Sequence, residues 1–86
     1  MGKLYFEDIV DVNTRHPYVF VYMLPDNEVF SPSAFAPFMD LAVQADRSLV
    51  MTIFESTNPV ALGVDQWLEI ARIAKEYHEE TLTNDD

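Results

Sequence analysis

The chain of 86 residues has 15 acidic and five basic residues, a formal net charge of −10, and no cysteine. Because 49% of the residues are hydrophobic, this acidity belongs to a folded domain and not to a disordered tail. The composition therefore predicts one domain over residues 1–86, with a modest core, no disulfides and no thiolate chemistry. A strongly negative surface repels nucleic acid and anionic membranes and attracts basic proteins.

The first two predicted elements are a short helix and a strand. Residues 4–13 are expected to form an amphipathic helix, because Phe6, Ile9 and Val10 recur at helical spacing with carboxylates on the other side. The His-Pro pair that follows ends this helix, since a residue before proline is pushed out of the helical region. Residues 18–23 are predicted to form a strand, because each of them is β-branched, aromatic or methionine.

The middle of the chain contains one clear strand and one ambiguous segment. Residues 28–30 follow a turn and are candidates for a short second strand. A serine cap and an early proline predict a helix over residues 33–44, but Pro37 opposes it, and an irregular or extended segment is the alternative. Residues 49–54 are again apolar and β-branched, which predicts a strand.

The last predicted element is a helix over residues 65–80, with Asp65 as its N-cap. Its apolar side chains recur at helical spacing and form one stripe: Trp67, Ile70, Ala71, Ala74 and Tyr77. We expect Trp67 to be buried and to anchor the helix on the sheet. Residues 81–86 are polar and are expected to fray.

These elements predict an α+β domain in which a small antiparallel sheet of two to four strands packs against two or three helices. The uncharged run at residues 49–54 is far too short to cross a bilayer. No signal peptide is visible in the first residues. The chain is therefore expected to be cytoplasmic and to make no membrane contact.

No set of residues in the sequence predicts catalysis, a metal or a cofactor. His16 and His78 are far apart in the chain, whereas zinc needs about four nitrogen or sulfur ligands. Neighbouring carboxylates on one exposed face do not provide the separated pair that acid–base catalysis requires. Two glycines cannot build a phosphate-binding loop, and five scattered basic residues do not support direct nucleic-acid binding. We therefore expect a protein that is not an enzyme.

The aromatic residues offer a candidate binding patch. Alternation along the strand at 18–23 places its three aromatic side chains on one face, where they would serve as anchors beside charged neighbours. The alternative is that the 33–44 segment covers this face as a second small core. The candidate partner-binding residues, including N-terminal carboxylates expected to steer association, are Glu7, Asp8, Asp11, Tyr18, Phe20, Tyr22, Asp26 and Glu28.

At the level of class, the chain resembles small acidic inhibitor proteins of bacteria and phages, in its size, acidity, lack of cysteine and α+β pattern. Residues 21–28 and 62–70 are similar to stretches of immunity-type domains. The resemblance implies an immunity protein that neutralises a basic toxin or nucleic-acid-handling enzyme, but it transfers no family residue to this chain. The alternatives are a phage anti-defence or DNA-mimic protein, and an acidic accessory or structural subunit. Such a subunit could be a homodimer joined through the aromatic strand.

Overall fold

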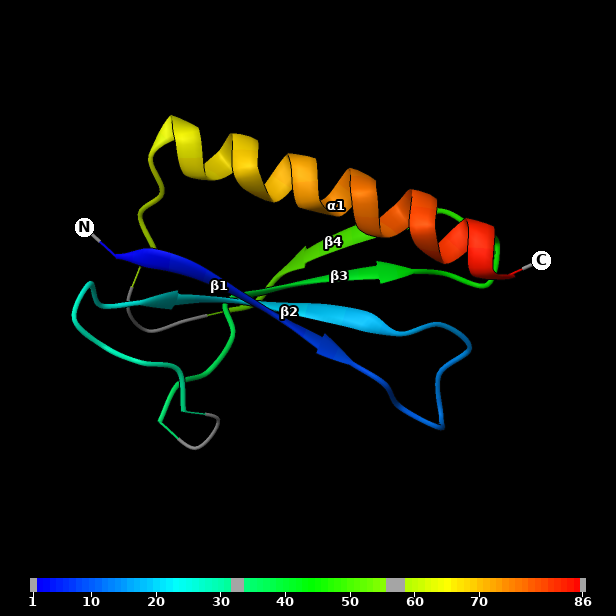
Figure 1. Ribbon diagram of the computed structural model, residues 1–86, viewed down its shortest axis with the longest axis horizontal. Coiled ribbons are helices and arrows are strands. Elements are labelled where there is room, and N and C mark those ends of the chain that lie inside the picture. Colours follow the sequence, from blue (N-terminus) through cyan, green and yellow to red (C-terminus); the bar gives the residue numbers. More distant parts are fainter. Residues whose placement is uncertain (1, 32–33, 56–58, 86) are drawn as a thin grey trace.

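The computed structural model describes residues 2–31, 34–55 and 59–85, and consists of four strands followed by one helix (Figure 1). In chain order the elements are β1 (Lys3–Ile9), β2 (Tyr18–Leu24), β3 (Met39–Val43), β4 (Leu49–Ile53) and α1 (Val64–Asp85). The strands pair antiparallel in the order β1-β2-β3-β4, so each strand lies beside its neighbour in sequence. The domain is α+β as predicted, but the described residues contain one helix where two or three were expected.

The predicted helix at residues 4–13 is wrong, because most of this segment forms β1 and pairs with β2. Phe6 lies opposite Val21, and Tyr5 lies opposite Tyr22. The apolar residues at the start of the segment fit a period of two as well as a helical period, so local pattern alone did not separate the alternatives. Pairing with the apolar β2 strand decides in favour of the extended form.

The predicted helix at residues 33–44 is also wrong for its described part, which contains β3. The alternating burial of residues 39–43 is typical of a strand, and Pro37 lies before it in irregular structure. The extended alternative is thus the one the structure adopts from residue 39 onward, while residue 33 lies outside the described residues. Residues 28–30 do not form a strand.

The C-terminal helix is longer than predicted, and only part of its predicted apolar stripe packs on the sheet: Ile70, Ala74 and Tyr77 do, whereas Trp67 and Ala71 are exposed. It continues through the segment expected to fray, where Thr81 is buried. The carbonyl of Gly63 accepts the backbone N–H groups of Gln66 and Trp67, so the helix starts one residue before Asp65. The prediction that Trp67 is buried is wrong, since 45% of this residue is exposed.

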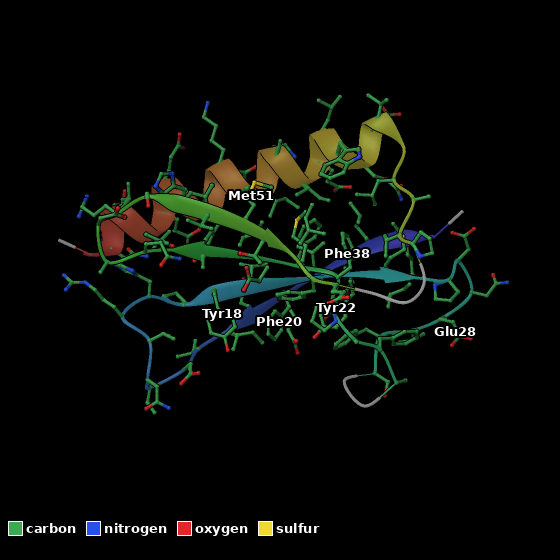
Figure 2. All side chains as sticks on the ribbon, turned by 180° about the vertical axis from the view of Figure 1, so that it is seen from behind. Tyr18, Phe20, Tyr22, Glu28, Phe38 and Met51 are labelled. Carbon is green, nitrogen blue, oxygen red and sulfur yellow. The ribbon has the colours of Figure 1, made fainter. Side chains whose placement is uncertain are left out.

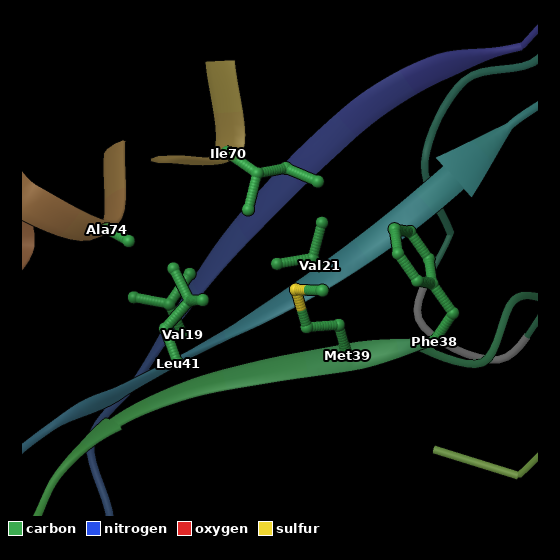
Figure 3. Close-up of a cluster of buried hydrophobic side chains, with 7 residues drawn as sticks. All are labelled: Val19, Val21, Phe38, Met39, Leu41, Ile70 and Ala74. Atoms are coloured by element: carbon green, nitrogen blue, oxygen red, sulfur yellow. The ribbon is translucent and has the colours of Figure 1, made fainter. Parts of the chain in front are cut away.

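The core lies between α1 and the face of the sheet that it covers (Figure 3). Ile70 and Ala74 of the helix project onto side chains of β2 and β3, and both are almost completely buried. The core cluster comprises Val19, Val21, Phe38, Met39, Leu41, Ile70 and Ala74. A single helix thus covers one face of the sheet and leaves the other face to the loops.

Candidate functional site

The face of the sheet opposite α1 is lined with aromatic side chains. Because side chains alternate along a strand, Val19 and Val21 of β2 face the helix, while Tyr18, Phe20 and Tyr22 point away from it (Figure 2). Successive rings on this face meet edge to face, with centroids 5.3 Å apart for Tyr18–Phe20 and 6.4 Å apart for Phe20–Tyr22. The predicted aromatic face therefore exists.

One half of this aromatic face is covered by the segment that follows β2. Phe30 stacks on Tyr5 with ring centroids 4.2 Å apart, and meets Tyr22 at 4.7 Å. Tyr22 is only 5% exposed as a result. This half is a second small core, but Phe30 covers it, and not residues 33–44 as in the alternative drawn from the sequence. Its rings contribute to stability, and Tyr22 offers almost no surface to a partner, although Tyr5 is 36% exposed.

Tyr22 also fixes a carboxylate on this face. Its hydroxyl donates a hydrogen bond of 2.7 Å to Oε1 of Glu7 on the neighbouring strand. Burial, followed by the hydrogen bond and charge of Glu7, raises the pKa of Tyr22 to about 12. The phenol therefore stays protonated at neutral pH and holds the Glu7 side chain in place.

We expect Tyr22→Phe to lower the free energy of unfolding at neutral pH by about 1.5 kcal/mol, because it removes a hydrogen bond to a charged group. The native pKa of about 12 exceeds the ordinary value of 10.0. The stabilisation from Tyr22 is thus complete below the ordinary value and is lost as the pH rises toward the native one. Urea unfolding at increasing alkaline pH should show a larger loss in the wild type than in Tyr22→Phe, which keeps the loss that comes from Tyr77, whose pKa is also raised by burial. Equal losses in both proteins would contradict the assignment, and Tyr5→Phe is the matched control.

The other half of the aromatic face carries an acid–aromatic row, formed by Glu7, Phe20 and Asp40. Phe20 on β2 lies directly opposite Glu7 on β1 and directly opposite Asp40 on β3. Residues in such positions have Cβ atoms about 5 Å apart on one face of a sheet. All three are half-buried, so a half-exposed ring lies between two carboxylates.

The acid–aromatic row has the composition of a site for a cationic side chain. The face of an aromatic ring attracts an ammonium or guanidinium group, and the attraction grows as water is excluded. Carboxylates on both sides add charge-assisted hydrogen bonds, which suit the planar guanidinium of arginine. Tyr18 and Phe54, with centroids 5.3 and 6.3 Å from Phe20, extend the apolar surface around it.

The structure does not bring all eight predicted partner-binding residues into one patch. Glu7 lies beside Phe20 and Tyr18 on the aromatic face, whereas the side chain of Asp8 is on the opposite face of β1. Asp11 lies in the β1–β2 loop, where its carboxylate accepts the backbone N–H of Asn13 at 2.8 Å. Asp26 and Glu28 lie beyond the other end of β2, on exposed loop positions. Only Glu7, Tyr18 and Phe20 contribute to the uncovered half of the aromatic face.

Asp40 is not among the predicted site residues, because the sequence predicts a helix over the segment that contains it. The alternation of Met39, Leu41 and Val43 with less apolar residues could have placed Asp40 on the opposite side of a strand. Its position beside Phe20, however, depends on the register between β2 and β3. That register is a tertiary property.

A separate groove of about 510 Å³ lies between β1 and the C-terminal half of α1. Its polar groups hold the loop before β2 against the helix: the hydroxyl of Tyr77 donates to the carbonyl of Pro17 and accepts the backbone N–H of Val43. Nδ1 of His16 lies 3.1 Å from the carbonyl oxygen of Val43. These contacts have a structural role. In the described ranges, no three histidine or acidic side chains come together as metal ligands would.

Comparisons with family models, with curated proteins and with solved structures give no match to this chain. In the part of the chain that the structure describes, no helix has both the length and the apolar character needed to cross a membrane.

Proposed function

We propose that this chain is an acidic protein-binding inhibitor, an immunity-type protein that neutralises a basic toxin or a nucleic-acid-handling enzyme. The observation that carries the proposal is the acid–aromatic row of Glu7, Phe20 and Asp40 on the helix-free face of the sheet. In this proposal the row receives an arginine or lysine side chain from the partner's nucleic-acid-binding surface. No catalytic step is assigned to the chain.

The charge of the whole chain supports the same type of partner. A formal net charge of −10 attracts a basic protein over long distances and accelerates encounter. Carboxylates outside the row, such as the half-buried Asp11 and the exposed Asp26 and Glu28, contribute to this steering. Phe20 and Tyr18 then serve as anchors, because aromatic side chains in a desolvated interface centre provide most of the binding energy. The hydrogen bond that Tyr22 donates to Glu7 holds the carboxylate of Glu7 in place in the row.

The recognition chemistry can be tested with a defined probe before a partner is known. Titration of the isotope-labelled protein with a short arginine-rich peptide should shift NMR signals around Phe20 and Asp40, more strongly than a lysine-rich peptide of equal charge. Asp40→Asn should weaken binding several-fold, because one of the two flanking charges is lost. Glu79→Gln is the matched control, since it removes the same charge from an exposed position on α1. If the peptide shifts the NMR signals of the acidic residues of α1 and leaves the signal of Phe20 unchanged, the proposed site is contradicted.

The inhibitory role needs a second experiment. The wild-type chain and Asp40→Asn should be compared as baits for proteins of the native host, and captured proteins assayed for activity with and without the chain. We expect a basic partner that is retained by the wild type, reduced with Asp40→Asn, and inactive in the complex. A partner whose activity is unchanged would contradict inhibition and favour an acidic accessory subunit.

An accessory subunit is the second candidate, and one observation favours it. The edge strand β4 contains no charged residue and exposes apolar side chains, including Met51 and Ile53. Such an edge is suited to assembly with another strand. A homodimer in which the aromatic strand β2 pairs with another copy of β2 is ruled out, because both edges of β2 are already paired, with β1 and β3.

A further inference from the structure

The two edges of the sheet differ in a way that points to assembly at one of them. Exposed strand edges are usually protected by charged side chains, because unpaired backbone groups otherwise recruit other strands. The edge strand β1 has this protection from Lys3, Glu7 and Asp8. The opposite edge strand, β4, consists of Leu-Val-Met-Thr-Ile and has none.

The hydrogen bonds of the β3–β4 hairpin determine which backbone groups remain free on that edge. Gln44 N–H donates to the carbonyl of Ser48 at 2.8 Å, and Phe54 N–H donates to the carbonyl of Phe38 at 2.8 Å. Because bonded and non-bonded pairs alternate in an antiparallel ladder, the even-numbered residues between them also point their backbone groups at β3. The N–H and C=O groups of Leu49, Met51 and Ile53 therefore point outward, away from the sheet.

The side chains along this edge are exposed and apolar. Met51 and Ile53, on the helix-facing side of β4, are 40% and 65% exposed, and Val50 on the other side is 40% exposed. Trp67 of α1 is 45% exposed and lines an apolar hollow of about 210 Å³ together with Ile53 and Val60. An uncharged edge with an apolar strip above it has the character of an interface centre.

We propose that β4 pairs with β4 of a second copy of this chain, antiparallel and about a two-fold axis through Met51, which gives a continuous eight-stranded sheet. The register follows from the strand itself. Only pairing centred on Met51 places all five residues of β4 opposite residues of the other β4, with Leu49 facing Ile53 of the second copy. The outward backbone groups of Leu49, Met51 and Ile53 then form the new ladder.

Charge complementarity supports the second copy as the occupant. Centred on Met51, the register places Arg47, in the turn before β4, at the same end of the interface as Glu55 of the second copy. The two-fold axis repeats this placement, so Arg47 of one copy and Glu55 of the other lie at each end of the interface. No like charges face each other along the paired strands, even though each copy has a net charge of −10.

The helices are compatible with this arrangement. α1 packs on β2 and β3 of its own sheet, and two β3 strands in the pair would lie about 14 Å apart, three strand spacings. A helix with its side chains is about 10 Å wide, so a narrow gap remains above the paired β4 strands. Trp67 and Met51 of both copies would fill this gap. The acid–aromatic row lies on the other face of each sheet and stays accessible.

The oligomeric state in solution tests the proposal. Sedimentation equilibrium from low micromolar to near-millimolar concentration should show a monomer–dimer equilibrium for the wild type. Met51→Lys should remove the dimer over this range, because two ammonium groups would meet at the two-fold axis. Leu68→Lys, the same charge change at a 62% exposed apolar position on α1, should leave it unchanged. A wild type that stays monomeric, or equal loss in both variants, would overturn the proposal.

Two further measurements test the register. Arg47→Glu should weaken the dimer about tenfold by placing two acidic residues at each end, and the double variant Arg47→Glu with Glu55→Arg should restore it. In the wild type, amide hydrogen exchange at Leu49, Met51 and Ile53 should slow as concentration rises, while exchange at Val50 and Thr52 stays slow throughout. A dimer without this concentration dependence would place the contact elsewhere.

Salt separates this proposal from the proposed inhibitory function. Two copies with the same net charge repel each other, so added salt should strengthen the dimer. Binding of a basic partner should weaken under the same conditions. Phe20→Ala should affect partner binding and not the dimer, and Met51→Lys should do the reverse, so each proposal can fail without the other.

Discussion

Replacing Ile70 with alanine is expected to lower the free energy of unfolding by about 3 kcal/mol, which is within the usual cost of truncating a buried isoleucine. Ile70 is fully buried, at 0% exposure, and packs from α1 onto the apolar face of β2 and β3 (Figure 3). Because α1 is the one described helix on this sheet, no other element can fill the cavity. A loss of this size is a large share of the stability of a small domain.

Leu68→Ala is the matched control for this change. Leu68 lies on the same helix and is 62% exposed, so its truncation should cost well under about 1 kcal/mol. Urea unfolding at low micromolar concentration, followed by circular dichroism, measures both variants against the wild type. Equal losses for Ile70→Ala and Leu68→Ala would show that the helix does not pack on the sheet through Ile70.

Phe20→Ala is expected to reduce the affinity for a basic partner by about thirtyfold, as for a central aromatic residue worth about 2 kcal/mol in an interface. The ring supplies both the apolar surface and the π face between the carboxylates of Glu7 and Asp40. Since no charge is removed, the loss should come from faster dissociation, with little change in the salt dependence of association. Asp40→Asn should instead slow association and reduce its salt dependence.

Two variants make this result interpretable. Phe20→Leu keeps an apolar side chain but removes the π face, so it should lose affinity with a smaller loss of stability. Trp67→Ala removes a 45% exposed aromatic residue from the helix side of the molecule and should leave partner affinity unchanged. Surface plasmon resonance against the identified partner resolves the two rate constants. If a folded Phe20→Ala protein dissociates from the partner with the same rate constant as the wild type, the partner binds another surface.

Several features of the protein follow from the sequence alone. Residues 18–23 have such high strand propensity on both faces that any packed arrangement leaves them extended, and they form most of β2. Residues 49–53 form β4 for the same reason. In the C-terminal segment, apolar residues recur at helical spacing over too many residues for a strand. The predicted helix is confirmed by α1. The net charge is a property of composition and does not depend on the fold.

The tertiary structure decided the remaining features. Residues 4–9 and 39–43 contain short patterns compatible with either a helix or a strand, and pairing on both sides of β2 made them strands. Which stripe of α1 faces the sheet depends on where the helix docks, and the docking left Trp67 exposed while burying Ile70. The acid–aromatic row exists only because two registers place Glu7 and Asp40 opposite Phe20. Register is determined by contacts between distant segments, since each strand taken alone fits several alignments.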